Sequence, residues 1–328
     1  MRNAFTKALR GLLPVIAVSI AATASAQEAY PAKPIRLVVP LPPGGGADGL
    51  ARIWSDYASR TLGTPVVVEN RAGVNGSLAA AFVASQPADG YTVLMTTQSN
   101  LALNRFSYGK LNYDPDQSFA GIGILATTPQ VLLAHSGVAA NTLTEFISLA
   151  KAAPGKYSYS SAGKGNSTHL NMEIMARHFG VNLLNVPYKG SAAALLATVS
   201  GETPLTSAVM FSAMPFIKDR KVKPLVVFSD KRLADLPGVP TLAEAGIPKS
   251  LGGGWYALVV PKGTPEAIVQ KLNGVTTKMW ADADARQKLN TIYMAEPADK
   301  APAAVRTATR QDVDQWGPLV KSLNLTAQ

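Results

Sequence analysis

One short stretch, YSSAGKGNSTHL at Tyr159–Leu170, brings together hydroxyl groups, an asparagine amide, two glycines and a histidine. It falls between a strand-like run at Lys156–Ser160 and a helical pattern that begins near Ser167. The exposed amides of a helix start attract an anion, and neighbouring hydroxyls add hydrogen bonds to a carboxylate. The glycines let the backbone approach such a ligand closely. The residues that we expect at this anion-binding loop are Ser161, Ala162, Gly163, Asn166, Ser167 and Thr168.

The same stretch raises the alternative of a hydrolase, with Ser167 or Ser161 as nucleophile and His169 as base. Two residues apart at a helix start, Ser167 and His169 point about 200° apart, so they would not face each other. The chain contains no G-x-S-x-G nucleophile elbow. Its three histidines are dispersed and it has no cysteine, so no cluster of metal ligands is evident. We therefore predict no catalytic residue, no metal and no cofactor, and interpret His169 as a structural hydrogen-bonding residue.

A second glycine-rich loop, PLPPGGGADG at Pro40–Gly49, also lies between a strand-like run and a helical pattern. A dinucleotide fingerprint could be fitted through its glycines, but a lone match of this kind is a weak signal. A tight turn in which Asp48 caps the following helix is a structural alternative. Two anion loops, one in each α/β unit, predict a cleft that closes around a solute with donors on both walls. We favour a loop that faces an anion, formed by Pro43, Gly44, Gly45, Ala47 and Asp48.

Such loops need an α/β framework, and apolar runs do alternate with helical patterns along the chain. Strand-like runs are predicted at residues 35–39, 65–70, 91–97, 156–160, 183–188, 223–229 and 255–261, with two more inside 121–135. Helical patterns are predicted at 48–62, 77–86, 143–153, 167–179, 191–199, from about 265, and at 302–323. This spacing predicts βαβ units and mostly parallel sheets. We expect two α/β lobes, with lobe 2 (125–228) inserted into lobe 1 (27–124 and 229–328).

The first residues have the organisation of a secretory signal peptide over residues 1–26. A basic segment precedes an apolar run at 12–23, and a small-residue cleavage pattern ends at Ala26. The apolar run is shorter than the ~20 residues that span a bilayer. We therefore predict cleavage near Ala26 and a periplasmic location, which suits a chain without cysteine.

The formal net charge of +10 falls to +7 when the three basic residues of the signal segment are removed. The lysines and arginines are scattered, and the densest patch, KDRKVK at 218–223, is interrupted by an aspartate. This pattern argues against a nucleic-acid partner and favours a modest attraction for anionic solutes. We expect a monomer.

With these residues in view, the sequence resembles the Bug-type, or TctC-type, periplasmic receptors of tripartite tricarboxylate transporters. The resemblance covers nearly all of the chain after residue 26. The motifs that carry it, in order, are YPAKPIRLVVPLPPGGGADGLAR, VVVENRAGVNGS, PADGYTVLM, YSSAGKGNSTHL, NVPYKGSAAAL, GVPTLAEAGIP and WYALVVPKGTP.

The resemblance implies a type II periplasmic-binding fold with two α/β lobes and a central ligand cleft. It implies a receptor that captures a small organic carboxylate and delivers it to a membrane permease with a large and a small subunit. The loop at Ser161–Thr168 would grip one carboxylate, and the loop at Pro42–Asp48 would approach the ligand. Ser99 and Tyr188 would also contact it.

Two positions depart from the family pattern. Asn166 stands where serine or threonine is common, although its amide still donates a hydrogen bond. Ala208 stands where an aspartate is frequent, which suggests a less polar pocket. We therefore expect an aromatic or apolar mono- or dicarboxylate, such as terephthalate. The alternatives are an accessory protein for a membrane histidine kinase and a secreted hydrolase.

Overall fold

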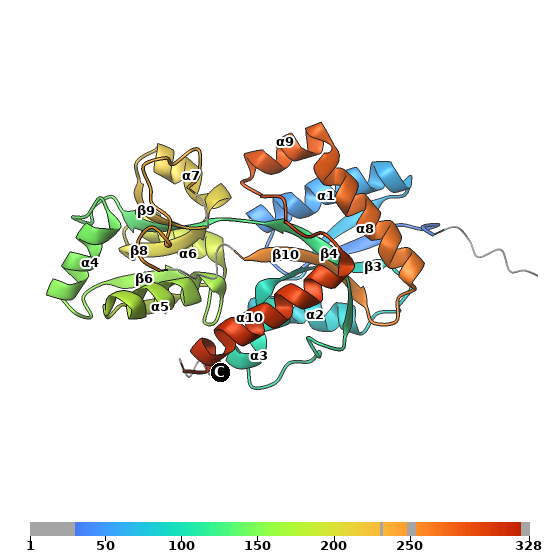
Figure 1. Ribbon diagram of the computed structural model, residues 1–328, viewed down its shortest axis with the longest axis horizontal. Helices are drawn as coiled ribbons and strands as arrows, with labels where there is room; N and C mark the ends of the chain where they lie inside the picture. Colours follow the sequence, from blue (N-terminus) through green and yellow to red (C-terminus); the bar gives the residue numbers. More distant parts are fainter. Residues whose placement is uncertain (1–29, 230–231, 248–253, 323–328) are drawn as a thin grey trace, which may run out of the picture.

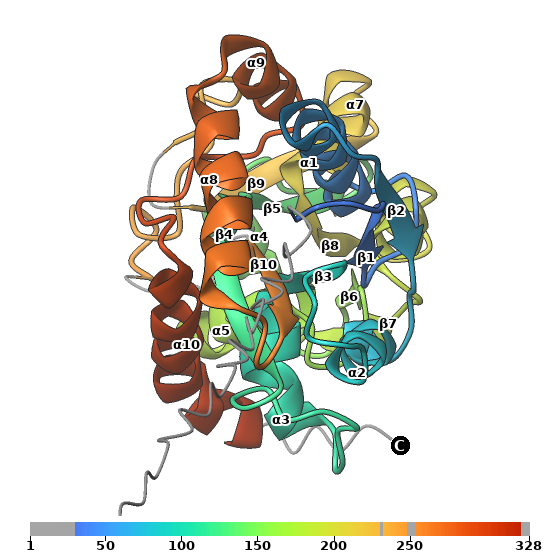
Figure 2. The same ribbon diagram turned by 90° about the vertical axis from the view of Figure 1, so that its right-hand side faces the viewer.

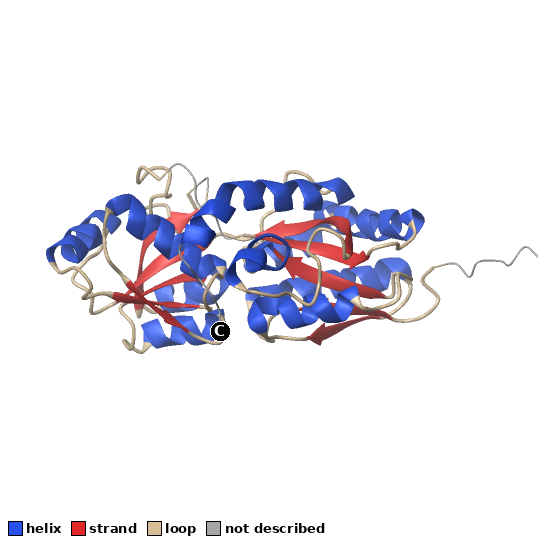
Figure 3. Cartoon of the chain, turned by 90° about the horizontal axis from the view of Figure 1, so that it is seen from below, coloured by secondary structure: helices blue, strands red, loops and turns tan. Residues whose placement is uncertain are grey.

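The computed structural model describes residues 30–229, 232–247 and 254–322. They form two α/β lobes, as expected, and each lobe is built on a five-stranded sheet with helices on both faces (Figures 1 and 3). None of the helices in these ranges has the length and apolar character needed to cross a membrane.

The first sheet has the strand order β2-β1-β3-β10-β4. Strand β1 pairs in parallel with β2 and β3, whereas β10 runs antiparallel to both β3 and β4. The sheet is therefore mixed, and the expectation of a mostly parallel sheet is wrong, because the chain returns from the second lobe to form β10 in the opposite direction. The strands are β1 (Ile35–Val39), β2 (Val66–Asn70), β3 (Thr92–Thr97), β4 (Phe119–Thr127) and β10 (Trp255–Pro261).

The helices of this lobe cover its sheet from both sides (Figure 2). Successive side chains of β1 alternate between the faces, so Leu37 packs among α1 and α8 while Val38 packs among α2 and α10. The indole of Trp54 is fully buried and donates to Thr276 Oγ1 at 3.1 Å, which joins α1 to α8. The helices are α1 (Gly46–Leu62), α2 (Ser77–Ala84), α3 (Asn104–Ser107), α8 (Glu266–Ala281), α9 (Ala283–Thr291) and α10 (Pro302–Ser322), with a 3-10 turn η1 (Val74–Gly76) and a π-helical turn η2 (Ser99–Leu103).

The second sheet repeats this arrangement in the order β7-β6-β8-β5-β9. Here β6 is parallel to β7 and β8, and β5 is antiparallel to β8 and β9. Because β6 occupies the place of β1, the loops after β1 and β6 are topologically equivalent. The elements are β5 (Gln130–His135), α4 (Leu143–Ala152), β6 (Ser158–Ser161), α5 (Ser167–Phe179), β7 (Leu184–Pro187), α6 (Ser191–Val199), β8 (Leu205–Val209), α7 (Met210–Lys218) and β9 (Val222–Phe228).

The chain crosses between the lobes twice. It leaves the first sheet after β4, enters the second at β5, and returns after β9 to form β10. This path agrees with an inserted second lobe, while the boundaries at 124, 125, 228 and 229 stay a prediction. Helix α10 also links the lobes, because Trp316 and Val320 pack with Leu170 of α5.

Several elements differ from the sequence-based expectation. Strand β8 and helix α7 are absent from it, because the run at 205–218 lacks a clear period and contains Pro215 inside the helix. Helix α1 begins at Gly46 with Gly45 as its N-cap, so the expectation that Asp48 is the capping residue is wrong. Asp48 falls instead in the first turn.

Candidate ligand-binding site

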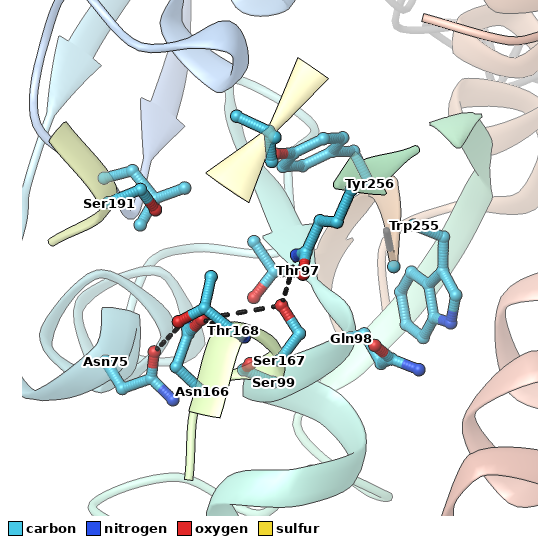
Figure 4. Close-up of a pocket in the computed structure, with 14 residues that line it drawn as sticks. Asn75, Thr97, Gln98, Ser99, Asn166, Ser167, Thr168, Ser191, Trp255 and Tyr256 are labelled. Atoms are coloured by element: carbon cyan, nitrogen blue, oxygen red, sulfur yellow. Dashed lines mark hydrogen bonds between the residues drawn. The ribbon is translucent and has the colours of Figure 1, made fainter. Parts of the chain in front are cut away.

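A cavity lies between the two lobes, and side chains from both of them line it (Figure 4). Every lining residue is uncharged. A bound anion would therefore be held by neutral hydrogen-bond donors and helix starts, without a lysine or arginine among the described residues of the lining. The lining residues are Leu41, Asn75, Thr97, Gln98, Ser99, Gln130, Asn166, Ser167, Thr168, Ser191, Val209, Gly254, Trp255 and Tyr256.

The start of α5 supplies the polar wall from the second lobe. Asn166 is the N-cap, and its Oδ1 accepts from the Thr168 amide at 3.0 Å. Thr168 Oγ1 in turn accepts from the Ala162 amide at 2.9 Å, which ties the helix start to the loop after β6. The Ser167 amide, as the first of the helix, has no acceptor within the helix. The hydroxyls and amides at this helix start are thus fixed beside the cavity.

Gln130, at the start of β5, holds Ser167 in place. Its Nε2 donates to Ser167 Oγ at 2.9 Å, while its Oε1 accepts from Asn171 Nδ2 at 3.0 Å and from Ser207 Oγ at 2.9 Å. The acceptor role of Ser167 leaves the hydroxyl hydrogen for another partner, and its contact with Asn166 Oδ1 is long at 3.5 Å. Gln130 did not stand out in the sequence, because β5 reads there as an ordinary apolar strand.

Helix α6 also begins at the cavity, with Ser191 as its first residue. Its N-cap is Gly190, which has no side chain to bond the free amides of the first turn. Gly190 has a φ of 102°, a conformation that favours glycine. The positive ends of α5 and α6 therefore both face the cavity.

The opposite wall comes from the first lobe. Thr97 and Gln98 follow β3, and Trp255 and Tyr256 begin β10. Tyr256 is almost fully buried, which raises the pKa of its hydroxyl to about 12 and keeps it neutral. Tyr256 packs in the apolar cluster beside α1 and α8, and Trp255 packs in the cluster beside α2 and α10, so each contributes to the wall from a different face of the sheet.

One side-chain hydrogen bond crosses the cavity mouth between the lobes. Asn166 Nδ2 donates to Asn75 Oδ1 at 3.0 Å (Figure 4). Asn75 is itself held by Asn100 Nδ2, which donates to its carbonyl at 2.8 Å, and by its own donation to Asn104 Oδ1 at 2.8 Å. Asn166 thus orients the site through both its amide oxygen and its amide nitrogen, and one of its two amide hydrogens is used on Asn75.

The structure brings four of the predicted site residues to the cavity lining: Ser99, Asn166, Ser167 and Thr168. Ser161 is fully buried under the loop, and its Oγ has no hydrogen-bond partner among the described residues. Ala162 and Gly163 are not among the lining residues, although the Ala162 amide donates to Thr168, which is one of them. Tyr188 donates instead to Glu202 Oε1 at 2.7 Å.

Ala208 lies in β8 and is 1% exposed. It packs in an apolar cluster with Val131 and Met214, and the neighbouring Val209 faces the cavity in its place. The polarity of the lining is consequently set by residues other than Ala208.

The glycine-rich loop of the first lobe contributes Leu41 to the cavity lining. The lining does not include the predicted residues Pro43, Gly44, Gly45, Ala47 and Asp48. Asp48 accepts hydrogen bonds from Arg52, from the Gly44 amide at 3.1 Å and from Asn70 at 3.1 Å. Burial acts to raise the pKa of its carboxyl, but these donors outweigh it and hold the pKa below its usual value. The carboxylate thus braces the glycine loop.

His169 has the structural role expected from the sequence. It is 3% exposed, stacks on Tyr159, and accepts from the Gly165 amide at Nδ1 (3.1 Å). Burial, with a smaller contribution from Lys164, lowers its pKa to about 4, so the ring is neutral at pH 7. Within the part of the chain that the structure describes, no group of three or more histidines, cysteines or carboxylates could hold a metal ion.

Two α/β lobes, crossed by connecting strands and closed around a cavity of neutral donors, define a two-lobed solute-binding protein. The chain belongs to the tripartite tricarboxylate transporter receptors, because the model of the "Tripartite tricarboxylate transporter family receptor" family matches residues 50–325. The fold is thus the predicted periplasmic-binding type with two lobes.

Individual proteins are similar to this chain in sequence and in structure. The chain is 36% identical to a UPF0065 protein from the tcbD-tcbE intergenic region of Pseudomonas sp. (strain P51), over 92% of this chain and 89% of that protein. It also resembles an R. palustris protein solved with adipate (TM-score 0.83, 32% identity, 89% of this chain and 97% of that one). A further similar structure is MatC from Rhodopseudomonas palustris with bound malate (TM-score 0.81, 30% identity, 89% and 100%).

Proposed function

We propose that this protein is a periplasmic receptor that captures a small organic carboxylate between its lobes and delivers it to a tripartite-type permease. The observation that carries the proposal is the start of α5, where Ser167 and Thr168 face the cavity with their acceptor sides already occupied. Their hydroxyl hydrogens and the Ser167 amide remain to bind an anion, because the Thr168 amide donates to Asn166 Oδ1. The similar structures with adipate and malate support a carboxylate as the ligand class.

We further propose a ligand with an aromatic or apolar body, such as terephthalate. The support is that Leu41, Trp255 and Tyr256 of the first lobe and Val209 of the second are among the lining residues and would pack against such a body. The carboxylate would lie at the opposite wall, beside α5. Closure of the lobes would expel water and strengthen each of these hydrogen bonds.

The test is a thermal-shift screen followed by titration calorimetry with terephthalate, benzoate, adipate, malate, citrate and glutamate. A solute at about 100 times its Kd should stabilise the folded protein by about 2.7 kcal/mol. We expect terephthalate or benzoate to bind most tightly. Exclusive binding of citrate or glutamate would contradict the apolar-body proposal, and binding of none of the six would contradict the carboxylate proposal.

Delivery to a permease is distinguished from sensing by the partner. We expect the solute-loaded protein to be captured by the large and small permease subunits, and capture by a membrane histidine kinase alone would favour the sensor role. Hydrolysis of nitrophenyl esters by the pure protein would favour an enzyme. N-terminal sequencing of the protein from a periplasmic extract should start just after Ala26, as a secretory signal peptide requires.

A further inference from the structure

The cavity wall contributed by β10 is anchored from outside the cavity. The indole of Trp255 is 9% exposed, and its Nε1 donates to Asp312 Oδ2 of α10 at 2.7 Å. Trp255 also lines a groove on the other side, with Ile124, Ala304 and Ala308. Trp255 therefore lines two hollows while its side chain packs in the apolar cluster with Val38 and Ala257, so its hydrogen bond to Asp312 adds a directional contact that packing alone does not supply.

Asp312 also serves other parts of the lobe. Burial raises the pKa of its carboxyl, and the side-chain donors of Trp255, Gln98 and Trp316 near the carboxyl act against that rise. Gln98 lines the cavity with Trp255, while Trp316 packs on Leu170 of the second lobe. Asp312 is not itself a lining residue of the cavity. Its carboxylate nevertheless lies near two side chains of the lining, Trp255 and Gln98, and near Trp316 at the contact between the lobes.

We propose that Asp312 is a positioning residue that fixes the indole of Trp255 and the amide of Gln98, and thereby sets the selectivity of the cavity for solutes with a flat apolar body. Trp255 Nε1 donates to one carboxylate oxygen, and the donors of Gln98 and Trp316 lie near the same group, whereas an asparagine would keep one acceptor oxygen and turn an NH2 donor toward them. A rigid aromatic carboxylate depends on the orientation of a flat wall, whereas a flexible aliphatic one adapts to a shifted wall. The consequence for selectivity rests on the carboxylate-binding function proposed above.

The experiment compares Asp312→Asn with Asp314→Asn, which removes the same charge from an exposed position on the same helix. The first readout needs no solute: near-UV circular dichroism and acrylamide quenching of tryptophan fluorescence, with Trp255→Phe identifying the signal of this ring among the four tryptophans. We expect Asp312→Asn to lose the Trp255 component and Asp314→Asn to retain it. An unchanged Trp255 component in Asp312→Asn would overturn the proposal.

The second readout is calorimetry with terephthalate and adipate. We expect Asp312→Asn to weaken terephthalate binding about tenfold and adipate binding about threefold or less, and Trp255→Phe to give the same change without further loss in the double variant. Equal losses for both solutes would overturn the proposed role in selectivity. Asp312→Glu, which keeps the charge, replaces Asp312→Asn if that variant does not fold, and it should restore part of the Trp255 signal. If the wild-type protein binds none of the six solutes named above, the proposed function fails while the first readout still decides the positioning role.

Discussion

The hydrogen bond between Asn166 and Asn75 joins the lobes directly, so its removal should shift the balance between closed and open forms. Asn75 has a left-handed backbone (φ 48°), and two other asparagines hold it in place. The acceptor, Asn75 Oδ1, is thus already fixed within the first lobe. The Asn75 side chain therefore loses little entropy when Asn166 bonds to it. A neutral hydrogen bond contributes about 0.5–1.5 kcal/mol net, which corresponds to about a 2-fold to 12-fold change in the ratio of closed to open forms.

Two substitutions remove this bond with little other damage. Asn166→Ser keeps an oxygen that can cap α5, since serine is as good an N-cap as asparagine, but it is too short to reach Asn75. Asn75→Gly removes the acceptor at a backbone conformation that glycine adopts readily. Each variant should open the protein by the stated factor, and the double variant should open it no further, because both lose the same bond.

The distance between the lobes can be measured directly, because the chain has no cysteine. Spin labels at Asp56→Cys on α1 and Lys151→Cys on α4, both exposed, would report it by pulsed electron paramagnetic resonance. Asn182→Ser, an exposed asparagine of the second lobe, is the matched control and should leave the distribution unchanged. The reasoning is refuted if Asn166→Ser behaves like this control, or if the two single effects add in the double variant.

Three further predictions follow from the site. Replacing Ser167 and Thr168 together by alanine should weaken terephthalate and adipate binding by about 1–3 kcal/mol in calorimetry, while Thr168→Ser should retain most of the affinity; full affinity in the double alanine variant would place the grip elsewhere. His169 has a pKa of about 4 when folded and an ordinary value of 6.5 when unfolded, so the free energy of unfolding should fall by on the order of 3 kcal/mol as the pH drops from 6.5 to 4. In denaturant titrations across this pH range, the free energy of unfolding should fall less steeply with pH for His169→Gln than for the wild-type protein. The same pH dependence in both proteins would contradict a neutral buried His169 ring. Asp48→Asn leaves Arg52 without its carboxylate and should destabilise the protein by about 1–3 kcal/mol in urea unfolding, whereas the exposed Asp56→Asn should have little effect; equal losses would argue against the bracing role of Asp48.

The sequence by itself located the start of α5 and its surroundings. Strand, glycine loop and helix N-terminus follow one another within a short segment there, so local propensity and capping decide the structure. Helices α5 and α6 and strands β1 and β10 have the predicted bounds, because each shows a clear apolar pattern with a capping or turn residue at its ends. Membership of the family followed from the order of short motifs along the whole chain.

Only the tertiary structure decided which other residues meet at the cavity. Asn75, Gln98, Gln130 and Trp255 lie on separate segments, and nothing in their local sequence marks them as neighbours. Asp48 looked like a cap or a ligand contact until its bonds to Arg52 and Asn70 showed a brace. The physical reason is that a cavity between lobes is made by contacts between distant segments. Sequence periodicity reports which face of an element is buried, but not which partner it meets.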